Sequence, residues 1–353
     1  MMPSKRTSVV FIALGLATLS GCGSSATHTA YVSLANSNAV AAYRINNHTA
    51  VFTTIVGSPY PAGNSPSSVR VHPSNKFVYV ANQSENDISL FTIDSAIGSL
   101  QEVLPRTATG LTPVSLATDS GGNFLFALNR ISGSISVYSI NSGSGALTAV
   151  AGSPFPTFPN PVAFALTPSA KFLYVVNANL ASVFAYTVKS GVLQPVAGLP
   201  VQVGNGPLAI TVDPAETFVY VANSADNTVS VLSINSSSGA LTLLDSFPTG
   251  TTPASVIVLG SYLYVANLGS SNISEFSVAP TTGVLTQITS SPVSAGAAPL
   301  FEVIDPNNLF LYVGSQTGRS ISAFSINAST GALTPTSQPA STGVSPSSMS
   351  VSK

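Results

Sequence analysis

The stretch FVYVANQSENDISLFTID, residues 77–94, is the unit from which most of this 353-residue chain is built. Similar segments begin at Phe124, Phe172, Phe218, Tyr262 and Phe310, and a more degenerate one begins at Ala30. The second aromatic residue of each copy recurs every 44 to 48 residues, at Tyr31, Tyr79, Phe126, Tyr174, Tyr220, Tyr264 and Tyr312. A near-constant period of that size in a strand-rich sequence is typical of a repeat fold.

Each repeat is predicted to contain four short strands, called A to D from the inside outward. Strand A begins at a proline, which a strand tolerates at its first position because no ladder N–H is needed there. Strand B is aromatic and β-branched and ends at Asn in five copies, where we expect an Asx turn. Strand C alternates, and a glycine-containing turn leads to strand D. Strand A is expected at residues 66–71, 113–118, 161–166, 207–212, 253–258 and 299–304.

The two ends of the repeat region predict how the fold closes. The first copy starts in strand B near Ala30, whereas SPSSMSV at residues 345–351 copies the strand A segment SPSSVRV at residues 65–71. We therefore predict an all-β, seven-bladed β-propeller of four-stranded antiparallel blades, in which the C-terminal strand completes the N-terminal blade. Such closure removes exposed sheet edges. The chain has no Trp, which excludes the WD40 class.

The first residues are interpreted as a targeting signal. Lys5 and Arg6 precede a short apolar run at residues 9–19, and the run ends in Leu-Ser-Gly-Cys at Cys22, which fits the bacterial lipobox. The predicted organisation is a lipoprotein signal peptide at residues 1–21, a lipid anchor and linker at 22–28, and the propeller at 29–353. Gly23 stands where inner-membrane retention signals place Asp, so we expect the bacterial cell envelope, at the outer membrane.

Composition limits the functions that the chain can have. Eleven Lys and Arg against twelve Asp and Glu give a net charge of −1 without a basic run, which argues against nucleic acid as a partner. Cys22 is the only cysteine, so there is no intramolecular disulfide and no cysteine-based metal site. Calcium loops and phosphate-binding glycine loops are not found in the sequence. We expect a monomer without a metal or a cofactor.

The repeated elements resemble those of the lactonase-type seven-bladed propellers, which include bacterial 6-phosphogluconolactonase, and of the YVTN-repeat propellers of cell surfaces. The resemblance rests on F-x-Y-V-x-N, I-S-x-F-S-I, S-G-x-L and the proline-led strand A, and it extends from Ala30 onward. It implies a site at the channel mouth where the B–C loops and D–A connections gather, with a His and Arg and Glu partners near the start of strand A. Here none of the residues that follow the strand A prolines is His.

Three residues are candidates for a catalytic site. Glu302 occupies a strand A position that is apolar in the other copies, and burying a carboxylate is costly unless it is paired or functional. Arg70 is the only cation at the next position of strand A. Arg130 lies in a B–C loop of the expected mouth. A structural ion pair or a solvated channel lining remains the alternative for Glu302 and Arg70.

Two functions stay open from the sequence. The first is an exported, lipid-anchored binding or surface-organising module, attached to the membrane through Cys22 and presenting one face to a small molecule, a glycan or a protein. The alternative is an enzyme, a lactone hydrolase and thus a carboxylic ester hydrolase, with Glu302 as acid and base and Arg70 or Arg130 stabilising the oxyanion. The alternative predicts that these side chains converge in one accessible pocket.

Overall fold

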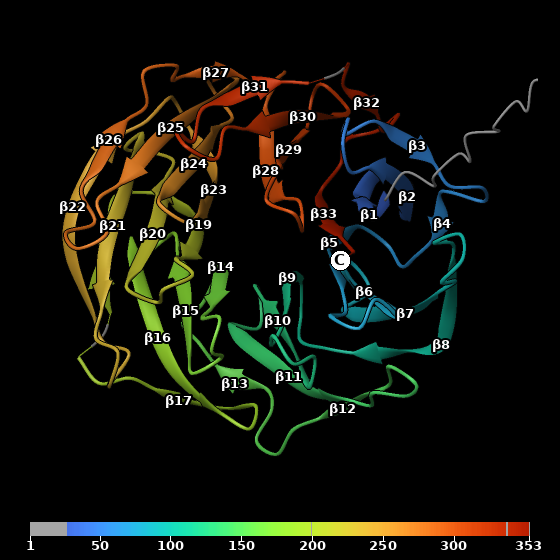
Figure 1. Ribbon diagram of the computed structural model, residues 1–353. Helices are drawn as coiled ribbons and strands as arrows, with labels where there is room; N and C mark the ends of the chain where they lie inside the picture. Colours follow the sequence, from blue (N-terminus) through green and yellow to red (C-terminus); the bar gives the residue numbers. More distant parts are fainter. Residues whose placement is uncertain (1–26, 199, 337, 353) are drawn as a thin grey trace, which may run out of the picture.

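A computed structural model describes residues 27–198, 200–336 and 338–352. These residues form seven antiparallel sheets arranged around a central axis, and Figure 1 shows the ring face-on. The seven-bladed propeller predicted from the repeat is therefore confirmed. We number the blades 1 to 7 in chain order, starting with the split blade that contains Thr27. The predicted signal peptide at residues 1–21 and Cys22 lie outside the described residues.

The two inner strands of each blade follow the repeat closely. The innermost strands are β5 (Pro66–Val71), β9 (Pro113–Thr118), β14 (Pro161–Leu166), β19 (Pro207–Val212), β23 (Pro253–Leu259), β28 (Pro299–Ile304) and β33 (Ser348–Val351). The second strands are β1 (Thr27–Leu34), β6 (Phe77–Asn82), β10 (Phe124–Asn129), β15 (Phe172–Asn177), β20 (Phe218–Asn223), β24 (Tyr262–Asn267) and β29 (Phe310–Ser315). A proline opens six of these seven innermost strands, as its missing N–H favours.

The two outer strands differ in regularity. The third strands are β2 (Ala39–Asn46), β7 (Asp87–Ile93), β11 (Ser134–Ile140), β16 (Ser182–Lys189), β21 (Thr228–Ile234), β25 (Asn272–Val278) and β30 (Ser320–Ile326). The outermost strand is continuous as β8 (Leu100–Ala108) and β22 (Leu241–Pro248). In the other blades it is broken into the pairs β3 (Phe52–Thr54) and β4 (Tyr60–Pro61), β12 (Leu147–Ala149) and β13 (Phe155–Pro156), β17 (Val192–Pro195) and β18 (Val201–Gln202), β26 (Leu285–Gln287) and β27 (Val293–Ser294), and β31 (Leu333–Pro335) and β32 (Ala340–Ser341).

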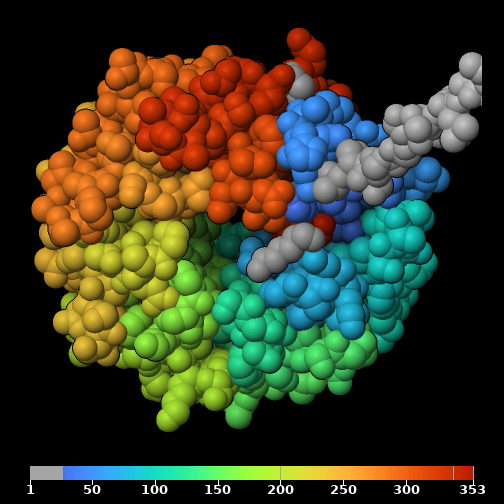
Figure 2. Space-filling model, viewed as in Figure 1, coloured from blue at the N-terminus to red at the C-terminus, as the bar shows by residue number. Residues whose placement is uncertain are grey.

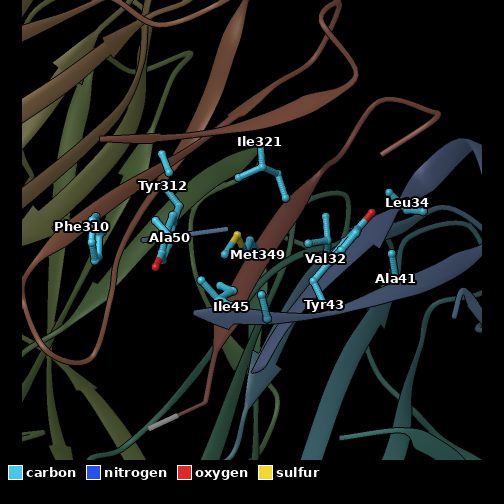
Figure 3. Close-up of a cluster of buried hydrophobic side chains, with 12 residues drawn as sticks. Val32, Leu34, Ala41, Tyr43, Ile45, Ala50, Phe310, Tyr312, Ile321 and Met349 are labelled. Atoms are coloured by element: carbon cyan, nitrogen blue, oxygen red, sulfur yellow. The ribbon is translucent and has the colours of Figure 1, made fainter. Parts of the chain in front are cut away.

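The ring closes as the repeated tail sequence predicts. Strand β33 pairs with β1, with Met349 opposite Val32 and Ser350 opposite Tyr31, so blade 1 combines the first and last described strands. Figure 3 shows Met349 in the apolar cluster that joins blade 1 to blade 7, where Phe310 and Tyr312 pack. Burying such side chains between blades is the main source of stability in a chain without disulfides.

The repeated tyrosine of the second strand links successive blades. The Tyr31 hydroxyl donates a hydrogen bond to the carbonyl of Gly98 in blade 2 at 2.9 Å, and Tyr79, Tyr174 and Tyr264 each repeat this contact with a turn glycine of the following blade. Gly145, the partner of Tyr79, has φ of +74°, and a Cβ there would lie 2.7 Å from the ring of Phe77. The tyrosine and the glycine of the repeat are thus two halves of one contact between blades.

Helical structure plays little part in the fold. The described residues contain the short 3-10 helix η1 (Ala35–Ser37). None of the helices formed by these residues is long and apolar enough to cross a membrane. Strand β1 begins at Thr27, two residues before the expected start of the propeller, and His28 therefore belongs to the sheet of blade 1.

Candidate functional site

The two charged side chains of the innermost strands mark the candidate site. Within the described residues, β5, β9, β14, β19, β23, β28 and β33 contain one carboxylate and one cation, Glu302 and Arg70. The remaining positions of these strands are small, hydroxylated or apolar. Strands β28 and β5 are neighbours of β33 on its two sides, so the two charges come from blades 7 and 2.

Glu302 lies in the packing between blades 6 and 7. The residue is 7% exposed, and the six side chains at its position in the other blades are buried too, as the sequence predicts. Neither carboxyl oxygen has a hydrogen-bond partner among the described residues. Burial raises the pKa of Glu302 to about 8; the Ser255 hydroxyl and the Ala266 backbone N–H lie near enough to oppose this in part, although neither meets the geometry of a hydrogen bond. The group is therefore mostly protonated at neutral pH.

Arg70 has a different environment, because its side chain is open to solvent inside the ring. It is the fifth residue of β5, and its side chain is exposed to the solvent inside the ring. The surrounding protein nevertheless removes part of its hydration, and this desolvation lowers the pKa of its guanidinium. Arginine nevertheless stays charged. Its Nε donates a hydrogen bond to the Thr118 hydroxyl in blade 3 at 3.3 Å. Among the described residues, no carboxylate lies within 4.0 Å of it, so its charge is not neutralised by an ion pair.

Arg70 and Glu302 line the same cavity. This cavity has a volume of about 620 Å³ and is lined by β5, β23, β28, β33 and the turn that follows β19. These segments come from blades 5, 6, 7, 1 and 2, which are consecutive around the ring, so the cavity lies at the axis. Figure 2 shows that the molecule is hollowed at the centre of the ring. The volume is in the range of small-molecule sites.

The cavity lies at the end of the channel opposite to the mouth that the sequence suggested. Pro214, Pro306 and Asn308, which line it, belong to the turns between innermost and second strands. Arg130 lies in the loop between β10 and β11, where its N–H donates to the Thr112 carbonyl just before β9 begins. Arg70 is four residues along its strand from the end at which Arg130 lies, and at the rise of a β-strand this corresponds to about 13 Å along the channel. The structure therefore brings Arg70 and Glu302 to one cavity and leaves Arg130 at the other end.

The histidines do not line this cavity. His72 is 4% exposed; its Nε2 lies 2.8 Å from the Gly122 carbonyl and its Nδ1 lies 2.7 Å from the Ser74 hydroxyl, so it joins two turns. His28 contacts the Asn307 side chain at 3.0 Å, and burial lowers the pKa of its imidazole. His48 is in an exposed turn. No group of three or more His, Cys, Asp or Glu side chains within the described ranges is arranged to hold a metal ion.

The Asx-turn interpretation of the strand-end asparagines is wrong for four of the five. The Nδ2 groups of Asn82, Asn129, Asn223 and Asn267 donate to a serine hydroxyl seven residues later in the third strand, each at 2.9 Å. Blade 4 has Phe184 at that position, and there Asn177 does accept the N–H of Leu180, at 3.0 Å. The spacing N-x6-S in the sequence was a signal for this buried link between strands.

A second buried glutamate, Glu275, was missed by the sequence reasoning. It is 0% exposed in β25, at a third-strand position occupied by Leu90, Val137, Ala185, Val231, Ala323 and Ala42 in the other blades. Its Oε1 accepts the backbone N–H of Leu333 in blade 7 at 2.7 Å, and its Oε2 accepts the Ser290 hydroxyl at 3.2 Å. Burial raises the pKa of Glu275, and these two donors oppose the change. The comparison of aligned positions that singled out Glu302 would also have found Glu275.

Comparison with known protein families identifies the relatives of this ring. The family described as "Lactonase, 7-bladed beta-propeller" matches residues 23–165 and 157–350. The chain belongs to this lactonase family. No curated protein sequence matches it significantly. Membership in the lactonase family is consistent with the seven sheets and with the way in which β33 completes blade 1.

Several solved structures share the fold. A protein of Bacteroides fragilis described as a putative 6-phosphogluconolactonase is 22% identical, with a TM-score of 0.81 over 93% of this chain and 98% of its own. The periplasmic gluconolactonase of Pseudomonas aeruginosa is 18% identical, with a TM-score of 0.78 over 93% of this chain and 99% of its own. A protein of Lactobacillus plantarum is 19% identical, with a TM-score of 0.80 over 93% and 100%. At these identities the likeness concerns the fold.

Proposed function

We propose that the protein hydrolyses lactones at the axial cavity that Arg70 and Glu302 line. The observation that carries this proposal is their meeting in one cavity, because no other charged side chain lies on the innermost strands as described. Membership in the lactonase family supports the reaction class. Of the two functions left open by the sequence, this is the one that the family and the cavity favour.

The reaction requires one proton transfer in each direction and one site for developing negative charge. Water adds to the lactone carbonyl, the ring C–O bond breaks, and a hydroxy acid leaves. The ionised form of Glu302 would accept the proton of the attacking water and return it to the ring oxygen. Arg70, which has no carboxylate partner among the residues that the structure describes, would stabilise the oxyanion and then the product carboxylate.

Glu302 must move for this to happen. Both of its oxygens are buried in the present conformation, so rotation of the side chain toward the channel would be needed to meet the substrate. Burial raises the pKa of Glu302 to about 8 in the described conformation, so ionisation of the carboxyl as the pH rises would favour its rotation into the channel, where it can act as a base. We therefore expect kcat to rise with pH up to about 8.

The buried oxygens of Glu302 also favour one competing function. In this second candidate, the propeller binds an anionic ligand at Arg70 and does not convert it. Such a module would match the first of the two functions open from the sequence. It predicts binding of hydroxy acids without turnover of any lactone.

The test is a hydrolysis assay of the purified protein on a panel of γ- and δ-lactones, with spontaneous hydrolysis subtracted. We expect turnover in the wild type and a loss of at least about a hundredfold in kcat for Glu302→Gln. Glu275→Gln is the matched control, because it changes a buried glutamate of the neighbouring blade away from the cavity and should retain kcat. Absence of turnover on every lactone, or full activity of Glu302→Gln, would overturn the proposal.

We also propose that Cys22 is lipid-modified and anchors the protein in the bacterial envelope. The lipobox at residues 19–22 supports this, and Cys22 lies outside the described residues. In a bacterial host, the wild type should incorporate labelled palmitate and fractionate with membranes, whereas Cys22→Ala should do neither. Membrane association that persists unchanged in Cys22→Ala would contradict the anchor.

A further inference from the structure

The connection that leads from blade 3 into blade 4 departs from the repeat. Three residues before the strand A proline, this connection has Phe158. The other six connections have a glycine at that position: Gly63, Gly110, Gly204, Gly250, Gly296 and Gly343. A Cβ at Gly110 or Gly204 would lie 2.7 Å from the side chain of the strand-end asparagine, so these connections have no room for a side chain.

Two further changes in blade 4 make room for Phe158. The Nδ2 of Asn177 donates to the Pro159 carbonyl at 2.7 Å, and not to a serine of the third strand as in four other blades. Phe184 takes the place of that serine, and its ring stacks on the ring of Phe158 with the centroids 4.1 Å apart. Phe158 is nevertheless 47% exposed. Three coordinated changes that end in an exposed aromatic ring favour a surface for binding over a contact for the fold.

Three more apolar side chains in the adjoining loops are 45 to 64% exposed: Leu111, Ile131 and Leu180. Backbone hydrogen bonds join these loops, from the Ile131 N–H to the Leu111 carbonyl at 3.2 Å and from the Thr157 N–H to the Gly133 carbonyl at 2.7 Å. Asn177, which binds the Pro159 carbonyl, also accepts the N–H of Leu180 at 3.0 Å. We call Leu111, Ile131, Phe158 and Leu180 the blade 3–4 patch. It lies at the end of the channel opposite to the axial cavity.

Arg130 adds an unpaired charge to the blade 3–4 patch. It precedes Ile131 and is exposed. No carboxylate of the described residues lies within 4.0 Å of its guanidinium, whereas Glu85 and Glu102 of the neighbouring blade 2 are both paired with Arg106. The patch therefore combines apolar side chains with one cation that is available to an anionic group of a ligand.

The size and the chemistry of the patch select its occupant. Four partly exposed side chains fall short of the roughly 800 Å² that each partner buries in a stable interface between proteins, which argues against a second copy of this chain. The side chains of Leu and Ile offer no hydrogen bonds to the hydroxyls of a glycan. We propose that the patch binds an extended peptide segment of a partner protein, with apolar side chains on Phe158 and its neighbours and an Asp or Glu carboxylate on Arg130.

The first experiment selects peptides for this patch without assuming their sequence. Random peptides displayed on phage are panned on the purified full-length protein, after removal of phage that bind the double variant Phe158→Gly/Phe184→Ser. The double variant restores the residues that blades 2, 3, 5 and 6 have at these positions, so it should fold. We expect the enriched peptides to combine large apolar residues with Asp or Glu. The Kd of a synthetic copy, measured by fluorescence anisotropy, should be at least about tenfold higher for the double variant.

Single substitutions test the apolar and the charged contacts separately. Leu180→Ser should raise the Kd about threefold or more, and it tests the patch even where the double variant does not fold. Leu244→Ser is the matched control, because Leu244 is also 45% exposed but lies on the outermost strand of blade 5, and it should leave the Kd unchanged. Arg130→Gln should raise the Kd about threefold or more, by a factor that shrinks in high salt.

Each outcome decides for or against the peptide. Weaker binding by the double variant, Leu180→Ser and Arg130→Gln, with none lost in Leu244→Ser, supports the inference. Failure to enrich any peptide, or equal affinity of the wild type and the patch variants, overturns it. A glycan-array ligand, or a dimer in sedimentation velocity, that the double variant loses also overturns it, because the patch would then have a different occupant. The lactone assay is independent of all these outcomes, since the axial cavity lies at the other end of the channel.

Discussion

Blades 6 and 7 each contain a buried glutamate, and the two residues differ in one respect that matters. Glu275 and Glu302 both replace an apolar or small side chain of the repeat, both are less than 10% exposed, and burial raises the pKa of both. Glu275 accepts hydrogen bonds from Leu333 and Ser290, whereas neither oxygen of Glu302 has a partner among the described residues. A buried carboxyl with partners serves the fold, and one without them costs stability and needs a functional reason.

The partners also show what Glu275 does in the ring. Its bond to the Leu333 N–H joins the third strand of blade 6 to the outer strand of blade 7, beside the contact between Tyr264 and Gly331. Within the described ranges, the carboxyl group of Glu302 makes no such bond. The comparison predicts opposite effects of mutation on stability, which can be measured independently of any activity.

The largest effect is expected from Glu275→Ala. It would leave the buried Leu333 N–H without an acceptor and open a void, so the free energy of unfolding should fall by about 4 kcal/mol. Urea unfolding followed by tyrosine fluorescence measures the change. Glu275→Gln, which can still accept the Leu333 N–H, should lose less than half as much. Equal losses would mean that packing volume, and not the hydrogen bond, accounts for the role of Glu275.

The second effect is a pH dependence that Glu302 imposes on stability. Its pKa is about 8 in the folded chain and near the ordinary glutamate value in the unfolded chain, so the folded state binds more protons between these limits. The stabilising contribution is present in full below pH about 4.5 and is lost as pH rises through about 8. Between pH 5 and 8 the wild type should lose on the order of 3 kcal/mol relative to Glu302→Gln. If the free energies of unfolding of the two proteins changed with pH in parallel, Glu302 would not have a raised pKa in the folded chain, and the prediction would be wrong.

The smallest effect is a gain. Glu302→Leu restores an apolar side chain at a position that is apolar in the other six blades, so it should stabilise the fold by about 1 kcal/mol at pH 7. The same urea titration applies, and loss of lactone hydrolysis is expected in this variant. Glu302→Leu that is destabilised by as much as Glu275→Ala would remove the distinction between the two residues.

The fold could be predicted almost completely because each blade repeats the same local rules. The segment at residues 345–351 copies the strand A segment at residues 65–71, and this likeness was sufficient to predict the pairing of β33 with β1. The interruption of the outermost strand in five blades was not foreseen, because short Ser-Pro turns such as Ser153-Pro154 lie within stretches that read as plain connections. Local turn chemistry predicts an Asx turn at Asn82 and its counterparts, whereas their actual partner is the serine seven residues later in the next strand.

The candidate site was predictable in part. When the innermost strands are aligned, Glu302 and Arg70 occupy positions at which the other copies have uncharged residues. The structure places both residues at one cavity. Arg130 was grouped with them from its loop alone. A strand of six residues separates the two ends of the channel, and position along the strand decides which end a side chain reaches. Hydrogen-bond partners, which distinguish Glu275 from Glu302, depend on contacts between blades and required the structure.

The pairing of β33 with β1 makes the proposed chemistry depend on a strand that the ribosome makes after all the other described strands. Met349, Ser350 and Val351 form part of the wall beside Arg70 and Glu302. A nascent chain that has emerged from the ribosome only as far as blade 7 has both charged residues but lacks the strand that lies between them. Products that terminate before β33 would therefore be open at the seam, and the proposed site would be incomplete in them.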